Sequence, residues 1–173
     1  MAEVSAVDVL LDGFGRVRES VEQVLDDLTG PQLTYRVGGS ANSIAWLVWH
    51  LTRVQDDHVA DVADTDQVWT GDGWVERFDL PLPATDTGYG HGGDQVAAVD
   101  APADLLLDYH RAVHDRTAAY LEGLRARDLS RVVDESWDPP VTLAVRLLSV
   151  VEDDLQHVGQ AAFVRGVLRT MPV

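Results

Sequence analysis

Four stretches of the sequence repeat apolar residues at steps of three and four, the spacing that gathers side chains on one face of an α-helix. These stretches cover about residues 7–28, 43–64, 102–125 and 142–164. Polar residues fill the positions between, so each helix is expected to bury one face and expose the other. Four amphipathic helices bury those faces by packing around one core. The sequence therefore predicts an all-α four-helix bundle, formed by residues 1–173 as a single domain.

Residues that begin or end helices support these boundaries. Gly30-Pro31 follows the first stretch, and Gly166 follows the last. Asn42 is a candidate N-cap for the second helix, because its side chain can accept from the first free backbone N–H groups. Pro102 falls in the first turn of the third helix, where its missing N–H does no harm.

A long linker, residues 65–99, separates the second and third helical stretches. It is rich in Gly, Asp and Pro, yet it contains Trp69, Trp74, Phe78 and Tyr89. Connections of this length in a compact domain are usually functional or disordered, and the aromatic residues argue against disorder. We expect an ordered cover over one end of the bundle.

The net charge of −16 restricts the partners of the chain. Nucleic acid and anionic membrane surfaces attract basic faces, so neither is an expected partner. No apolar run is long enough to span a bilayer. The first residues lack a basic n-region and carry Asp8 and Asp12, unlike a signal peptide. These features indicate a cytoplasmic protein that acts on a small molecule.

The sequence contains no cysteine. Disulfides, thiolate metal ligands and a cysteine nucleophile are therefore excluded. Any thiol chemistry requires a thiol supplied from outside the chain. Any metal must be bound by His, Asp or Glu, which favours a borderline or hard divalent ion.

One set of residues outlines a metal site on two helices. Asp153 and His157 are four residues apart, so they share a helix face about 6 Å apart along the axis. His50 lies at the edge of the apolar stripe of the second helix. Two histidines and one carboxylate leave positions open for water or substrate, which is typical of catalytic sites. Asp154, three residues before His157, is a competing ligand, and periodicity alone leaves the choice open.

The other histidines have simpler interpretations. On spacing alone, a packed histidine or a solvated Asp–His pair is commoner than a metal site. His110 and His114 form a second pair four residues apart, of which His110 could face the bundle while His114 falls further round. No carboxylate is placed to complete a site, and a partly exposed pair is expected. His58 is about 12 Å beyond His50 along its helix, so the two cannot share one ion. His91 lies in the cover, from which it could approach the site.

Two motifs resemble those of DinB/YfiT-like proteins. Residues 42–51 (NSIAWLVWHL) are similar to the second-helix motif, and residues 153–160 (DDLQHVGQ) to the fourth-helix motif, in which a ligand His precedes Gly. The family pattern places one ligand on the second helix and two, four residues apart, on the fourth. The resemblance thus implies His50, His157 and Asp153, rather than Asp154. In the family, the ligand at the position of Asp153 is often His or Glu. The side chain of Asp is shorter, which affects how far this ligand reaches and which metal the site binds.

The resemblance also implies a function. Characterised members include mycothiol-dependent maleylpyruvate isomerase and metal-dependent mycothiol S-transferases. We therefore expect a thiol S-transferase or isomerase with a divalent metal, zinc first and nickel, iron or manganese as alternatives. Mycothiol or another low-molecular-weight thiol would be the second cofactor. Arg146, on the same helix face as Asp153, is a candidate anchor for an anionic group, and Trp46 a candidate cofactor contact.

Two other functions fit the same residues. A metal-dependent hydrolase would use activated water at the same ligands. A non-catalytic, stress-response binding bundle would need no chemistry at the site, so its ligand positions would tolerate alanine.

A homodimer formed through an exposed helix face is a further expectation, although the sequence shows no clear patch for it.

Overall fold

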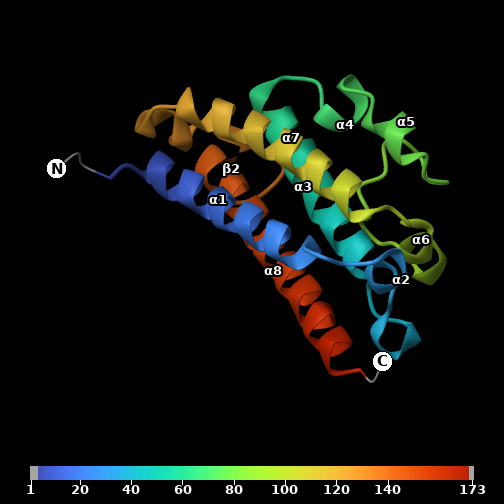
Figure 1. The fold of residues 1–173 in the computed structure, drawn as a ribbon. Coiled ribbons are helices and arrows are strands. Elements are labelled where there is room, and N and C mark those ends of the chain that lie inside the picture. Colours follow the sequence, from blue (N-terminus) through green and yellow to red (C-terminus); the bar gives the residue numbers. More distant parts are fainter. Residues whose placement is uncertain (1–3, 172–173) are drawn as a thin grey trace.

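Four long helices form the bundle in the computed structural model, which describes residues 4–171 (Figure 1). They are α1 (Ala6–Leu25), α3 (Ile44–Ala63), α7 (Ala103–Glu122) and α8 (Leu143–Thr170). Each of α1 and α3 packs against both α7 and α8. The all-α four-helix prediction is confirmed. None of the described helices combines the length and apolarity needed to cross a membrane.

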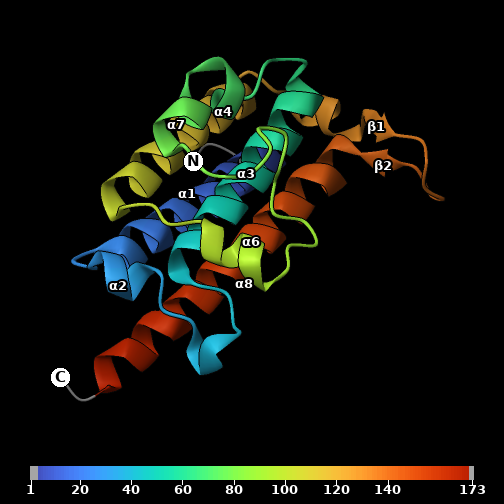
Figure 2. The ribbon, with the colours of Figure 1, turned by 90° about the vertical axis from the view of Figure 1, so that its right-hand side faces the viewer.

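Short elements connect these helices. They are α2 (Gly30–Leu33), η1 (Val37–Gly39), α4 (Val68–Gly71), α5 (Trp74–Phe78), α6 (Gly93–Ala98), η2 (Ala126–Ser130), β1 (Val132–Asp134) and β2 (Val141–Thr142). The two strands pair as an antiparallel hairpin just before α8 (Figure 2). The helical periodicity of the sequence does not predict this hairpin, because its strands are only three and two residues long.

Two helix boundaries differ from the predictions. The N-cap of α3 is Ser43 rather than Asn42, since the Ser43 hydroxyl accepts from the backbone N–H of Trp46 at 3.2 Å. Helix α8 continues through Gly166 to Thr170. A glycine inside a helix costs about 1 kcal/mol, but Val164 and Leu168 on either side of it pack against the core. This packing offsets the cost and extends the helix.

The chain direction of the helices explains the long linker. Thr52 contacts His110 and Gln55 contacts Thr117, so residue numbers rise together along α3 and α7 and these helices are parallel. The chain leaves the end of α3 and must return to the start of α7. Because α3 has 20 residues, that return covers about 30 Å. The linker therefore runs along the bundle instead of covering one end, as Figure 2 shows.

The linker is ordered and packed, as the sequence predicts. Trp69, Trp74 and Phe78 are buried, and their rings lie 5.2, 5.3 and 5.6 Å from the ring of Tyr109 on α7. Tyr89 differs from the other aromatics, because it is 93% exposed. Since the linker covers the outer side of α3, every residue from Ile44 to Arg53 is buried.

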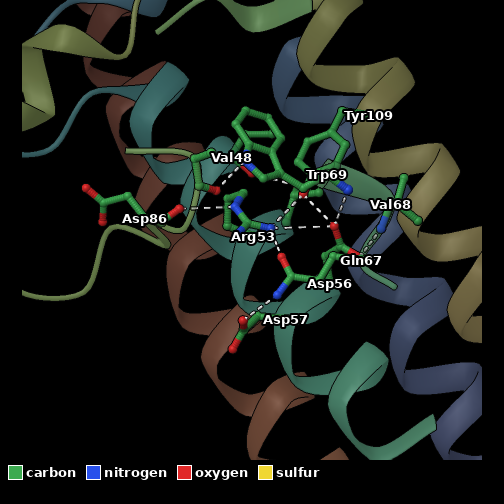
Figure 3. Close-up of polar contacts among 11 residues, drawn as sticks. Val48, Arg53, Asp56, Asp57, Gln67, Val68, Trp69, Asp86 and Tyr109 are labelled. Carbon is green, nitrogen blue, oxygen red and sulfur yellow. Dashed lines mark hydrogen bonds and ion pairs between the residues drawn. The ribbon is translucent and has the colours of Figure 1, made fainter. Parts of the chain in front are cut away.

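Arg53 fastens the linker to α3 (Figure 3). Its side chain has no exposure, and Asp56 on the same helix lies 3.6 Å from its Nη1. Arg53 also donates to the side-chain oxygen of Gln67 at 3.0 Å and to the backbone oxygen of Asp86 at 3.2 Å. A buried guanidinium needs such partners, since an unpaired charge in the interior is costly. The charge thus draws two parts of the linker onto α3.

Asp56 secures the start of the linker as well. Its carboxylate accepts from the backbone N–H groups of Val68 and Trp69 at 2.9 and 2.8 Å, and from the Tyr109 hydroxyl at 2.9 Å (Figure 3). Burial raises the pKa of Asp56, and these hydrogen bonds oppose that rise. The carboxylate is thereby held among donors at the beginning of α4.

A polar layer divides the apolar core into two clusters. Gln55, Thr117 and Asp154 are all buried on α3, α7 and α8, between members of the two clusters. The Gln55 amide donates to the Thr117 hydroxyl at 2.8 Å. No protein group within residues 4–171 hydrogen-bonds the carboxyl oxygens of Asp154.

Large apolar side chains are exposed along α8. They are Val145, Leu148, Leu155 and Phe163. Such a face could meet a second copy of the chain, so the homodimer stays a prediction.

We predict that Asp56→Ala lowers the free energy of unfolding by about 3–5 kcal/mol, because it leaves Arg53 buried without its carboxylate. Denaturant unfolding followed by circular dichroism measures the change. Asp61→Ala is the matched control, since Asp61 is exposed on the same helix. Its effect should stay within about 0.5 kcal/mol. Equal losses in the two variants would contradict the importance of the buried pair.

Candidate metal centre

Three side chains converge where α3 and α8 pack against each other. One ligand atom from each of His50, Asp153 and His157 lies within 4.8 Å of the others. The imidazole rings of the two histidines are 4.7 Å apart between centroids. No other group of three His, Asp or Glu side chains in the described part of the chain meets this condition. The structure thus brings together the residues that the sequence indicates as ligands.

The antiparallel arrangement of the two helices creates this meeting point. His50 on α3 faces His157 on α8, and two turns further along α3, His58 contacts Arg146, which lies earlier on α8. His50 is 7% exposed because the linker lies over it. Asp153 and His157 are half-buried at the same seam.

Backbone carbonyls hold the two imidazoles in one tautomer. Nδ1 of His50 lies 2.5 Å from the oxygen of Thr87, and Nδ1 of His157 lies 2.8 Å from the oxygen of Asp153. A carbonyl oxygen only accepts, so each Nδ1 carries the hydrogen and each Nε2 keeps its lone pair. This is the usual arrangement of a metal-binding histidine. Burial, the main cause, lowers the pKa of His50 and favours the neutral ring.

The carboxylate of Asp153 completes the donor set. Its Oδ2 is buried, and no protein group in residues 4–171 hydrogen-bonds it. It lies 3.4 Å from Nδ1 of His157. A buried carboxylate oxygen without a donor is costly unless a cation is near. Two imidazole nitrogens and one carboxylate oxygen therefore fit a divalent ion of the zinc, nickel, iron or manganese type.

Asp154 faces away from this seam. It has no exposure and lies in the polar layer of the core. Burial, with a smaller contribution from Asp153, raises the pKa of Asp154 well above its ordinary value. The buried position of Asp154 thus favours its neutral form, whereas Asp153 lies beside the histidines.

Trp46 forms one wall of the site. Its indole stacks on the ring of His50, with centroids 4.5 Å apart and planes 18° apart, and lies 6.3 Å from the ring of His157. Its Nε1 donates to Nδ1 of His91 at 3.1 Å. Trp46, the predicted cofactor contact, therefore lies next to the candidate ligands, but its side chain is buried.

The linker contributes residues that the sequence alone does not single out. Thr87 supplies the carbonyl for His50, and Gly88 packs directly on the His50 ring. His91, expected only near the site, is linked to Trp46 and to Asp86. The sequence signal for these linker contacts is the glycine-rich segment around residue 90, because glycines often mark a close approach of the backbone to another group.

Arg146 lies two turns before Asp153, close to its predicted place. Its Nη1 donates to Nδ1 of His58 at 3.0 Å, and its Nη2 to the carboxylate of Asp134 at 3.2 Å. His58 therefore contacts Arg146 and lies apart from the three candidate ligands, as its distance along α3 predicts. Anion binding by Arg146 stays a prediction.

The His110–His114 pair does not form a second site. His110 has no exposure, and its Nδ1 lies 3.1 Å from the Thr52 hydroxyl. Because that hydroxyl donates its hydrogen to the oxygen of Val48, it accepts from Nδ1 of His110. Burial lowers the pKa of His110 to about 3, so its ring is neutral. The expected partial exposure is wrong for His110, because it points between α3 and α7. His114 is half-buried beside Asp115.

Comparisons with known proteins identify the family of this chain. The family model of mycothiol-S-transferase matches residues 9–170. The crystal structure of a conserved protein from Enterococcus faecalis superposes with a TM-score of 0.87 at 31% sequence identity, covering 94% of this chain and 96% of that chain. No curated protein sequence matches significantly. Because the family match extends over nearly the whole bundle and includes all three candidate ligands, the chain belongs to the mycothiol S-transferase family.

Proposed function

We propose that this protein is a metal-dependent S-transferase that joins mycothiol, or a thiol of similar kind, to a small electrophile. The observation that carries the proposal is the convergence of His50, Asp153 and His157 at one seam of the bundle. Membership of the mycothiol S-transferase family supports the choice of substrate.

The three side chains would hold one divalent ion through two Nε2 atoms and a carboxylate oxygen. Zinc is the first candidate, because three such ligands with an open position are typical of catalytic zinc. A divalent ion held by these residues would supply a positive charge that lowers the pKa of a bound thiol, so that thiolate would form at neutral pH. The chain has no cysteine, so the attacking sulfur must come from the thiol substrate.

Other residues would bind the rest of the thiol. Arg146 lies about 10 Å from Asp153 along α8, and its contacts with His58 and Asp134 hold the guanidinium in place. A guanidinium has five N–H groups, so these two contacts leave donors for an anionic or hydroxyl group. Trp46 would provide an apolar surface beside the ligands.

We predict that the untagged protein purifies with about one equivalent of zinc, nickel, iron or manganese per chain. His50→Ala and His157→Ala should lose it, because each removes one nitrogen ligand. Elemental analysis of the purified proteins measures this. His58→Ala is the matched control, since His58 lies in the same seam outside the three ligands, and it should keep the metal. A wild-type protein that takes up none of these ions would leave the two histidines as packed residues.

We also predict metal-dependent consumption of thiol. The metal-loaded protein should conjugate mycothiol to an epoxide or an activated aryl halide, and removal of the metal should abolish turnover. Arg146→Gln should raise KM for the thiol more than it lowers kcat, because it weakens binding away from the reacting sulfur. Steady-state assays of free thiol give both constants.

Two outcomes of these assays would contradict the transferase. Equal thiol consumption with and without metal would remove the need for the site. Turnover of esters or amides in the absence of thiol would support the metal-dependent hydrolase instead.

A further inference from the structure

A tight turn of the linker packs against the side chain of the candidate ligand His50. This turn, residues 86–91, places the oxygen of Thr87 2.5 Å from Nδ1 of His50. At Gly88 the backbone has φ +94°, and a Cβ added there would lie 2.6 Å from the same nitrogen and 3.1 Å from the Trp49 ring. The backbone thus occupies the space beside the imidazole, and only glycine fits at this position.

Asp86 and His91 close the turn. One carboxylate oxygen of Asp86 accepts from the backbone N–H of Gly88 at 3.2 Å, and the other lies 2.9 Å from Nε2 of His91. The backbone N–H of His91 donates to the oxygen of Gly88 at 3.2 Å. Since Trp46 can only donate to Nδ1 of His91, the hydrogen of the neutral ring lies on Nε2 and points at Asp86. Every polar atom of the His91 ring therefore has a partner.

One face of α3 receives the closed turn. Trp46, Trp49, His50 and Arg53 follow the spacing i, i+3, i+4, i+7, which is a single helix face. Trp46 donates to His91, Trp49 stacks on the His91 ring with planes 18° apart, and Arg53 donates to the backbone of Asp86. The fourth residue on this face, His50, meets the Thr87 carbonyl.

Residues 86–93 contain four glycines, so the backbone has little stiffness of its own. Its order must come from the side chains that tie it down, and the His91 side chain, only 2% exposed, is the central one. The same side chain holds the indole that stacks on His50. The His91 side chain therefore contacts Trp46 directly and closes the turn that carries Thr87, and both Trp46 and Thr87 touch the His50 ring.

We propose that His91 and Asp86 are positioning residues of the metal centre. They hold the turn so that Thr87 fixes the tautomer of His50 and Trp46 fixes the plane of its ring, which leaves Nε2 free to bind an ion. This inference rests on the metal site proposed above. Groups that orient a ligand in this way commonly change metal affinity by about 10- to 100-fold when they are removed.

The test compares four variants with the wild-type protein. His91→Leu and Asp86→Ala break the closed turn. His91→Gln is the conservative variant, because its amide can accept from Trp46 and donate to Asp86. Tyr89→Ala is the matched control, since Tyr89 belongs to the same turn but is 93% exposed.

Two readouts are measured on folded protein, with the unfolding midpoint of each metal-free variant as a check. Competition with a chromophoric chelator gives the affinity for zinc. Ring ¹⁵N chemical shifts of the metal-free protein report the His50 tautomer. We expect His91→Leu and Asp86→Ala to weaken zinc binding about 10- to 100-fold and to mix the two tautomers of His50. His91→Gln should keep most of the zinc affinity and most of the single His50 tautomer. Tyr89→Ala should change neither the affinity nor the tautomer.

The outcomes separate this inference from the proposed function. If the wild type binds zinc and His91→Leu binds it equally well with an unchanged His50 tautomer, the positioning is wrong and the metal centre stands. If the wild type binds no metal yet the tautomer depends on His91, the positioning of His50 stands and the proposed function fails. A His91→Leu protein that is less stable but keeps both readouts would show a purely structural contact and overturn the inference.

Discussion

The buried charge of Arg53 determines where the linker lies. A guanidinium without solvent must be met by acceptors, and α3 itself supplies only Asp56. The Tyr109 hydroxyl on α7 accepts one of its hydrogen bonds, and Gln67 and the backbone of Asp86, at two distant points of the linker, accept the others. Asp86 is also the first residue of the turn that contacts His50. The pairing of one cation in the interior therefore fixes the backbone beside a candidate metal ligand.

The parallel direction of α3 and α7 makes this arrangement necessary. A parallel pair in a bundle requires a long crossover, and the crossover has to lie against some face of the molecule. Here it covers the outer side of α3, which turns an amphipathic helix into one that is buried all round along Ile44–Arg53. His50 thus lies at a seam with α8 on one side and the linker on the other, where solvent is limited and an ion–ligand contact is stronger.

Much of the fold could be predicted from the sequence, because periodicity reports which residues share a helix face. The four long helices follow from it, and so does the pairing of Asp153 with His157. Periodicity carries no information on helix direction, so the parallel α3 and α7 could not be foreseen. It also could not choose between Asp153 and Asp154, which depends on the rotation of α8. The contact of Thr87 with His50 joins residues 37 apart in the chain, and only the glycines around residue 90 signal a close approach there.

Asp153 and Asp154 are neighbours in the sequence, but their side chains lie in different surroundings. Asp154 faces the core, where burial raises its pKa and favours the neutral acid. If Asp154 were ionised, its negative charge would lie next to that of Asp153. Each carboxylate would then disfavour the ionisation of the other. Asp153 instead faces the seam, where its carbonyl fixes the tautomer of His157 while its side chain reaches toward the two histidines. Asp153 therefore offers a carboxylate oxygen to the candidate site with its side chain, and its backbone carbonyl orients the imidazole of His157.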